Sequence, residues 1–274
     1  MNNVRSEAEI RHILSTIPIL MYHKVDHHRE VGINALPPER FLGHLSWLSE
    51  NGYQSTTFLD ILHRKPLPEK PVIISFDDGY LSVYENAFPA MQTIGFTGVI
   101  FVISGFAGKL NEWDVSLNRQ RFRHLSPNHI RELAAAGWEI GAHSVTHRAL
   151  PLLSETQVRR EMQESREKIA EWANQPVISF AYPFGIKTAR ERQLAKECGF
   201  QFGCKGVRGS QSIDVLNLPR IPVYQFETAK HLVQKMKHPL PAAERIKLSL
   251  LGLPAYLVPI YQFLFKQELS LDRL

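Results

Sequence analysis

Two aspartates stand side by side at the end of an apolar segment. Residues 72–80 read VIISFDDGY, so Asp77 and Asp78 directly follow a run that is typical of a buried strand. Neighbouring carboxylates repel each other, and neither is buried cheaply without a partner. Either the pair lies in water as an ordinary turn, or a positive group holds it. Because adjacent residues of a strand point in opposite directions, the two carboxylates can serve different purposes.

Two histidines follow a second apolar segment. EIGAHSVTH, residues 139–147, ends with His143 and His147, and histidines at this spacing reach one metal ion if the backbone between them turns. On their own, such histidines are more often surface residues of a loop. With one aspartate they make a three-ligand set with an open position, the pattern of a catalytic zinc-type site. The other aspartate could then accept a proton from water at that position.

Two more strand ends carry candidate groups. SFAYPFGIK, residues 179–187, contains a tight Pro-Phe-Gly loop that is either a plain turn or a wall with a backbone N–H aimed at a developing oxyanion. ILMYHKVDHH, residues 19–28, places His23 at the end of the first expected strand. A lone histidine in such a place is more often structural or solvated than catalytic.

The segments that must position these groups alternate between strand-like and helix-like patterns. The helix-like segments include 154–174, which begins with a capping box of Ser154 and Gln157. This alternation predicts an α/β domain, either a barrel or a doubly wound sheet, with chemistry at the ends of the strands. The expected strands are apolar on both faces, as parallel strands are, and cover 17–23, 72–77, 98–103, 138–143 and 177–182, with weaker ones near 200–205 and 215–223.

Composition limits the classes of partner. The chain has 274 residues, 44% of them hydrophobic, which is enough for one large domain or two small ones. Its two cysteines are too few for a disulfide framework. The net charge of +5 favours anionic partners in general, but no basic run is interleaved with aromatic residues, so nucleic acid is not expected.

The order SFDDG, HSVTH, FAYPFG on successive strand ends resembles the polysaccharide deacetylases, which share the chitooligosaccharide deacetylase homology domain. The resemblance implies a distorted (β/α) barrel of about seven parallel strands over residues 17–226. It leaves an N-terminal extension at 1–16 and a helical tail at 227–274. It also implies one divalent metal ion, in this family usually zinc, and removal of N-acetyl groups from the amino sugars of a polysaccharide or glycan precursor.

The resemblance also assigns roles by position. Asp77 matches the general base, and Asp78, His143 and His147 match the metal ligands. FAYPFG falls on the family's groove motif, which includes Tyr182 and in which Phe184 occupies the place whose backbone N–H faces the oxyanion.

The chain departs from the family pattern at two places. The arginine that usually orients the base is replaced by Ala181, and Arg220 could supply that charge from another strand. A leucine-x-histidine motif that usually carries the general acid is missing after residue 205. MYHKV resembles the opening strand of the exopolysaccharide (poly-N-acetylglucosamine) deacetylase branch, which implies that His23 is the general acid.

Two alternatives remain open at this point. The same site could remove a formyl or other N-acyl group from a lipid-linked sugar or a small substrate. Alternatively, the barrel could bind glycan without turning it over, which the missing arginine and the displaced histidine favour.

The tail and the N-terminus bear on location. Residues 230–266 combine basic and apolar residues, which favours a helix lying on an anionic membrane or packed against the barrel or a partner subunit. The nearest transmembrane candidate, 248–265, is interrupted by Pro254 and Pro259. Charged residues are scattered through the first 20 residues, unlike a secretory signal. We therefore expect a cytoplasmic enzyme that could lie at the inner face of the membrane.

Overall fold

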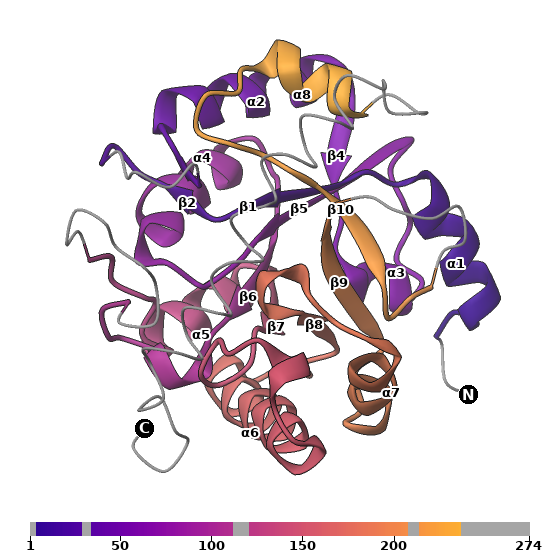
Figure 1. Ribbon diagram of the computed structural model, residues 1–274. Coiled ribbons are helices and arrows are strands. Elements are labelled where there is room, and N and C mark those ends of the chain that lie inside the picture. Colours follow the sequence, from indigo (N-terminus) through magenta and orange to yellow (C-terminus); the bar gives the residue numbers. More distant parts are fainter. Residues whose placement is uncertain (1–3, 29–33, 112–120, 208–213, 237–274) are drawn as a thin grey trace.

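Seven parallel strands form a closed barrel. The computed structural model describes residues 4–28, 34–111, 121–207 and 214–236. Around the ring the strands follow the order β1-β10-β9-β8-β7-β6-β5, and β1 pairs with both β10 and β5, which closes the circle (Figure 1). The strands are β1 (Ile19–Tyr22), β5 (Lys70–Phe76), β6 (Val99–Val102), β7 (Glu139–Ala142), β8 (Ser179–Ala181), β9 (Phe202–Val207) and β10 (Leu218–Pro222).

The predicted barrel of about seven parallel strands is therefore confirmed, and the doubly wound sheet is excluded. Three short strands lie outside the ring. β4 (Tyr53–Ser55) pairs with the start of β5, and β2 (Lys24–Val25) pairs with β3 (Ala35–Leu36). The described helices are α1 (Glu7–Thr16), α2 (Pro38–Glu50), α3 (Phe58–Leu62), α4 (Phe88–Thr93), α5 (Pro127–Ala135), α6 (Glu155–Ala173), α7 (Ala189–Glu197) and α8 (Ala229–Met236).

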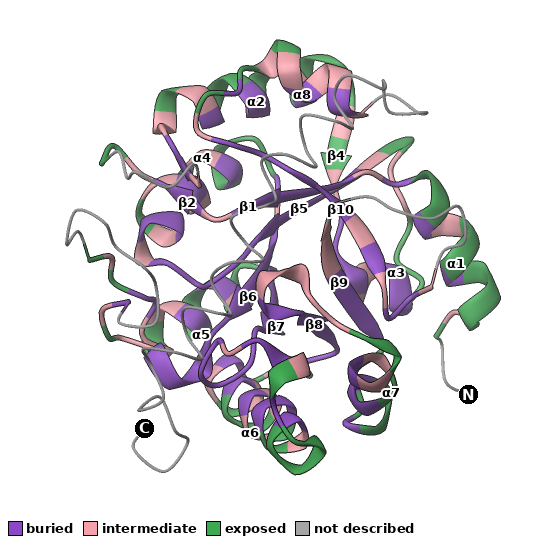
Figure 2. Cartoon of the chain, viewed as in Figure 1, coloured by how far each residue is buried: buried purple, intermediate pink, exposed green. Residues whose placement is uncertain are grey.

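The barrel strands are buried on both faces, as Figure 2 shows. This explains why their sequences are continuous apolar runs instead of alternating patterns. Packing inside the ring is tight at Gly141, where a Cβ atom would lie 2.5 Å from the ring of Phe101 and 2.7 Å from Ser179 Oγ. Only glycine fits at that point of β7 without moving its neighbours.

Both predicted extensions contact the barrel where the structure describes them. α1 begins with a capping box at Ser6 and buries Ile10 and Leu14 in the core. At the other end of the chain, α8 packs on α2 (Figure 1). Residues 7–16 and 227–236 are therefore packed parts of the domain.

Lys235 on α8 is not available to a membrane surface, which agrees with the alternative that this part of the tail packs against the barrel. Its side chain is fully buried, and its Nζ donates hydrogen bonds to the carboxylate of Glu227 and to Pro222 O at 2.7 Å. Because the ammonium group is paired inside the protein, it cannot interact with anionic lipid. The rest of the tail, 237–274, lies outside the described residues, and membrane contact there stays a prediction.

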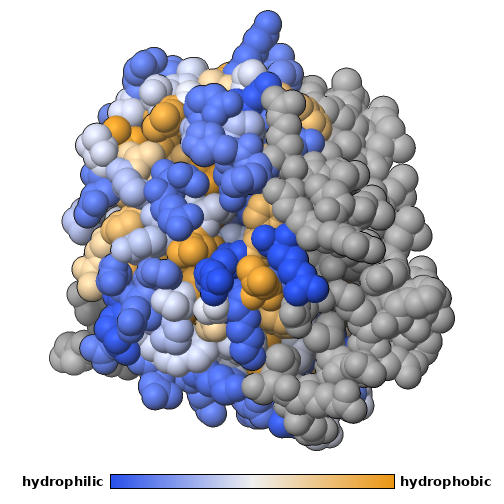
Figure 3. All heavy atoms as spheres, turned by 90° about the vertical axis from the view of Figure 1, so that its left-hand side faces the viewer, coloured by the Kyte–Doolittle hydropathy of each residue, from blue (hydrophilic) through white to orange (hydrophobic). Residues whose placement is uncertain are grey.

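None of the described helices combines the length and apolar character needed to cross a bilayer. The described part of the face in Figure 3 is largely hydrophilic, and its apolar side chains lie in small separate groups.

Glu139 is a buried carboxylate at the start of β7. It accepts hydrogen bonds from Leu59 N at 2.8 Å and Ser179 Oγ at 2.6 Å, and so joins the first turn of α3 to β8. Burial raises the pKa of Glu139 from its ordinary value of 4.5 to about 7. Hydrogen-bond donors offset only part of the cost of removing the charge from water.

We predict that Glu139 makes the fold less stable as the pH rises. Between pH 4.5 and 7 the folded chain binds more protons than the unfolded chain, so this stabilisation is present at low pH and is lost through pH 7. From pH 5 to 8, unfolding free energy should fall by roughly 2–3 kcal/mol more in the unsubstituted chain than in Glu139→Gln. Urea unfolding at both pH values measures this, and parallel pH dependences would contradict it.

Candidate metal centre and active site

Three potential metal ligands converge at the carboxyl ends of β5 and β7. Asp78, His143 and His147 offer ligand atoms that all lie within 4.8 Å of one another, and all three residues are buried. Asp78 Oδ1 lies 3.3 Å from His143 Nε2 and 3.4 Å from His147 Nε2. The two imidazole Nε2 atoms are 3.2 Å apart. One carboxylate and two imidazoles directed at a common point are a donor set that suits a divalent cation such as zinc.

The backbone after β5 turns sharply to bring Asp78 into this cluster. Asp78 has φ 70° and Gly79 has φ 67°, both in the left-handed region that favours glycine. Behind the turn, the buried ring of His124 bonds Asp78 O through Nδ1 at 2.8 Å. Burial lowers the pKa of His124 to about 4, so the ring is neutral and its Nδ1–H donates to the carbonyl.

Asp77 points to a different partner. Arg220 from β10 binds it with both arms, NH1 to Oδ1 and NH2 to Oδ2, each at 2.6 Å. The guanidinium also donates to Lys205 O at 3.0 Å and to Ser75 Oγ at 3.3 Å, so its orientation is held by two other strands. Arg220 of β10 therefore supplies a positive charge to Asp77, although position 181 carries alanine.

The charges of the cluster stabilise one another. Burial would raise the pKa of Asp77, but the charges of Arg220 and then His143 lower it below its usual range. Burial opposes ionisation of Asp78 in the same way, and the hydrogen bond from His143 is the main interaction that lowers its pKa. Both aspartates are thus carboxylates at neutral pH.

The two histidines differ in charge. Burial and the nearby charge of His143 lower the pKa of His147 to about 3, so its ring is neutral. Burial also favours a lower pKa for His143, but the interactions of its ring with the carboxylates of Asp78 and Asp77 are stronger and raise the pKa. His143 Nδ1 faces Ala181 O at 2.7 Å, which fixes the ring with Nε2 toward the cluster. A bound cation would take the place of the proton that the carboxylates favour on Nε2.

His23 follows β1 and lies close enough for its charge to act on both aspartates. Its ring is half-buried, and its Nδ1 atom is buried with no hydrogen-bond partner among the described residues. The position, at the same end of the barrel as the other groups, fits a residue that faces a ligand.

The Pro-Phe-Gly turn after β8 covers one side of the cluster. Phe184 has φ 59°, and its ring packs edge-on against His147 with ring centres 4.6 Å apart. Tyr182 is placed differently from the groove residue that the sequence suggested. It is 1% exposed and its hydroxyl donates to Leu216 O at 3.0 Å, so its side chain supports the barrel wall and presents no polar group to a ligand.

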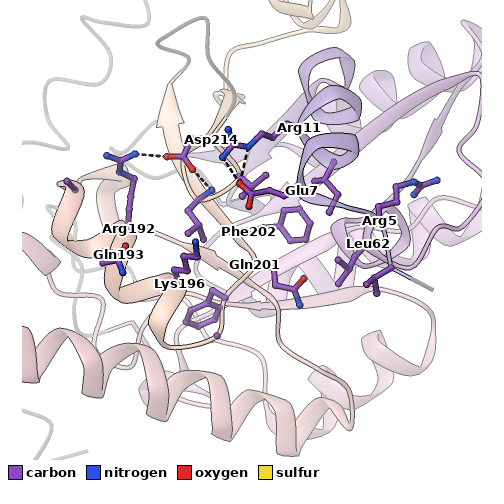
Figure 4. Close-up of a pocket in the computed structure, with 17 residues that line it drawn as sticks. Arg5, Glu7, Arg11, Leu62, Arg192, Gln193, Lys196, Gln201, Phe202 and Asp214 are labelled. Carbon is purple, nitrogen blue, oxygen red and sulfur yellow. Dashed lines mark hydrogen bonds and ion pairs between the residues drawn. The ribbon is translucent and has the colours of Figure 1, made fainter. Parts of the chain in front are cut away.

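A cavity of about 660 Å³ lies elsewhere, between α1 and α7 (Figure 4). It is bordered by Phe202 at the start of β9, whereas the ligand cluster follows the ends of the strands. Its two carboxylates are paired with arginines, Glu7 with Arg11 and Asp214 with Arg192. The cavity is therefore separate from the candidate metal centre.

Residues 64–203 of the chain match the family model for polysaccharide deacetylase. The chain belongs to the polysaccharide deacetylase family. Among curated relatives, it is 30% identical over 202 residues to YxkH of Bacillus subtilis, a protein named as a polysaccharide deacetylase. That match covers 72% of this chain and 67% of YxkH.

Relatives with a named substrate match a smaller share of this chain. The poly-beta-1,6-N-acetyl-D-glucosamine N-deacetylase of Staphylococcus aureus is 22% identical over 64% of this chain, and the match spans 62% of that protein. The Escherichia coli enzyme of the same name is 33% identical over 34% of this chain, which is only 16% of its own length.

Solved structures share the deacetylase fold. Streptococcus pyogenes deacetylase PplD has a TM-score of 0.70 at 24% identity, covering 81% of this chain and 98% of its own. IcaB from Ammonifex degensii has a TM-score of 0.65 at 25% identity, covering 76% of this chain and 91% of its own.

Sequence analysis missed two residues around the site. His124 lies in a loop with no informative spacing, so no sequence signal identifies it. Glu161 does carry a signal, because it stands three residues after the buried Val158 on the inward face of α6. A carboxylate at a core position requires partners.

We predict that removing Arg220 leaves Asp77 as a buried, unpaired charge. Arg220→Met should lower the unfolding free energy at pH 7 by about 3–5 kcal/mol, and adding Asp77→Asn should restore part of it. The control is Arg192→Met, which breaks a half-exposed pair with Asp214 and should cost at most about 1 kcal/mol. Denaturant unfolding of the four chains provides the comparison. Equal losses from the two arginine substitutions would contradict the argument.

Proposed function

We propose that this chain is a divalent-metal-dependent hydrolase that removes N-acetyl groups from amino sugars of a glycan. The observation that carries the proposal is the convergence of Asp78, His143 and His147 beside the separately held Asp77–Arg220 pair. The site thus offers a ligand set and a second carboxylate next to it, which is what metal-assisted hydrolysis of an amide needs.

The three ligand residues fit a cation for a physical reason. They bring an ionised carboxylate and two imidazole nitrogens within 3.2–3.4 Å of one another inside the protein, an arrangement that a central positive charge stabilises. A bound divalent cation, most simply zinc, would polarise the amide carbonyl and acidify water. Asp78, His143 and His147 would hold it and leave a position open to substrate.

Asp77 is suited to accept the proton of the attacking water. Arg220 keeps its carboxylate ionised at neutral pH and fixes both oxygens, so the base needs no reorientation during the reaction. A strongly ionised carboxylate is a weak base, and it therefore requires a water whose acidity has been increased.

Two further groups complete the proposed mechanism. His23, at the end of β1, would donate a proton to the nitrogen of the departing amine, which leaves poorly without one. The backbone N–H of Phe184, in its strained turn, would donate a hydrogen bond to the oxygen that becomes negative.

The substrate proposal rests on relatives. The Staphylococcus aureus and Escherichia coli proteins are named for poly-beta-1,6-N-acetyl-D-glucosamine, so a β-1,6-linked N-acetylglucosamine oligomer is the first substrate to test. Release of acetate and of free amine should occur together. An unmodified N-acylated monosaccharide and a lipid-linked N-acetylated sugar provide the comparison that separates the polymer from a smaller substrate.

We predict that substitutions of the two adjacent aspartates have different effects on metal binding and on turnover. Asp78→Asn should lose tightly bound metal and activity together, because it removes a charged ligand. Asp77→Asn should keep the metal and lower kcat by about 10²–10⁴-fold, since only the proton acceptor is lost. Metal analysis of the purified chains and acetate release measure the two effects. Near-normal turnover by Asp77→Asn would contradict the mechanism. If the unsubstituted protein contained no metal but still bound the oligomer, the alternative of a barrel that binds glycan without hydrolysing it would be favoured.

We predict that hydrolysis depends on His23 only when the substrate has a poor leaving group. His23→Gln should lower kcat on the N-acetylated oligomer by about 100-fold or more, because the amine must be protonated to leave. Hydrolysis of 4-nitrophenyl acetate should change little, since its phenolate leaves without a proton. Asp77→Asn is the matched control and should slow both reactions. Equal losses on both substrates in His23→Gln would show that His23 does not act as the acid.

A further inference from the structure

The segment His143–His147 carries two of the three candidate ligands in a conformation that its own residues do not favour. Ser144 has φ 66° and His147 has φ 55°, and neither is glycine. Side chains disfavour this region of backbone space, so contacts from outside the segment must maintain it. The question is which residue supplies them.

Glu161 on α6 makes the largest set of these contacts. Its Oε2 accepts hydrogen bonds from Val145 N at 2.8 Å and Thr146 N at 2.9 Å, and its Oε1 accepts one from Thr146 Oγ1. The carboxylate thus binds both residues that separate Ser144 from His147. Ser144 Oγ accepts the next amide, His147 N, at 2.9 Å.

Burying the carboxylate of Glu161 lowers the stability of the fold unless its hydrogen bonds to the segment compensate. The side chain is 1% exposed and lies on the face of α6 that otherwise packs Val158, Met162 and Ile169 into the core. α6 lies against β7 (Figure 1), and from this helix the carboxylate reaches the segment that follows the strand. An apolar residue at this position would pack equally well but would leave two buried amides unsatisfied.

Two more backbone contacts of the segment come from η2 (Ser104–Phe106). Ser104 N donates to Ser144 O at 3.1 Å, and Gly105 N donates to Val145 O at 3.0 Å. These bonds tie the carbonyl side of the segment to the end of β6. Glu161 ties the amide side to α6, and the two sets together define the turn between the histidines.

We infer that Glu161 is a positioning residue of the metal centre, which sets the distance and angle between the His143 and His147 rings. It touches neither substrate nor ligand atoms and acts through the backbone of Val145 and Thr146. The inference rests on the proposed function, because it concerns the affinity of the same centre for a divalent cation.

The test measures Zn²⁺ affinity of the full chain by competition with a chromogenic chelator. Glu161→Ala should weaken binding by about 10- to 100-fold, the usual cost of losing an outer partner of a metal site. Glu161→Gln should stay close to the unsubstituted chain, because its amide oxygen still accepts both backbone amides. Thr146→Val, which removes only the hydroxyl donor, should give an intermediate loss.

The matched control is Met162→Ala, which truncates the next residue of α6 and opens the core without removing a bond to the segment. It should destabilise the fold but leave Zn²⁺ affinity nearly unchanged. Equal affinity of Glu161→Ala and the unsubstituted chain would overturn the inference, and so would equal losses in Glu161→Ala and Met162→Ala.

The same set of variants covers the case in which Glu161→Ala does not fold. Thr146→Val must then weaken Zn²⁺ binding more than Met162→Ala does, and failure to do so overturns the inference. Absence of Zn²⁺ binding by the unsubstituted chain would overturn the proposed function as well. Normal Zn²⁺ binding with no effect of these substitutions would overturn only the role of Glu161.

Discussion

Two adjacent negative charges buried at the end of β5 are the constraint on which the rest of the site depends. Asp77 and Asp78 are 4% and 5% exposed, so water cannot offset their repulsion. The structure separates them by pairing each with a different positive or polar group. Arg220 holds Asp77 with two hydrogen bonds, while the imidazoles of His143 and His147 face Asp78. Two carboxylates that repel each other in isolation are thereby given different partners, as the proposed roles of base and metal ligand require.

The closed barrel makes this separation possible. Parallel strands all end at the same rim, so groups that follow β1, β5, β7 and β8 meet there despite lying far apart in the sequence. Closure of the ring also places β10 and β5 on either side of β1. Arg220 of β10 thereby contacts Asp77, which is 143 positions away in the sequence. The site is therefore a product of ring closure as much as of its motifs.

Much of the fold and the ligand set could be predicted from local patterns. Continuous apolar runs identified the barrel strands, because both faces of each strand are covered. The DDG and HxxxH spacings identified Asp78, His143 and His147, because a metal site needs particular donor types near strand ends. The role of Lys235 could not be predicted, because its partner Glu227 becomes apparent only when α8 is packed.

The sequence by itself determined which residue types stand at the strand ends and therefore which chemistry the rim can support. Only the tertiary structure decided which groups pair. It assigned Arg220 to Asp77, turned Tyr182 away from the rim and brought Glu161 under the histidine segment. The reason is physical: spacing along a strand or helix gives the direction of a side chain, whereas charge pairing depends on distances across the barrel that arise only when the ring closes.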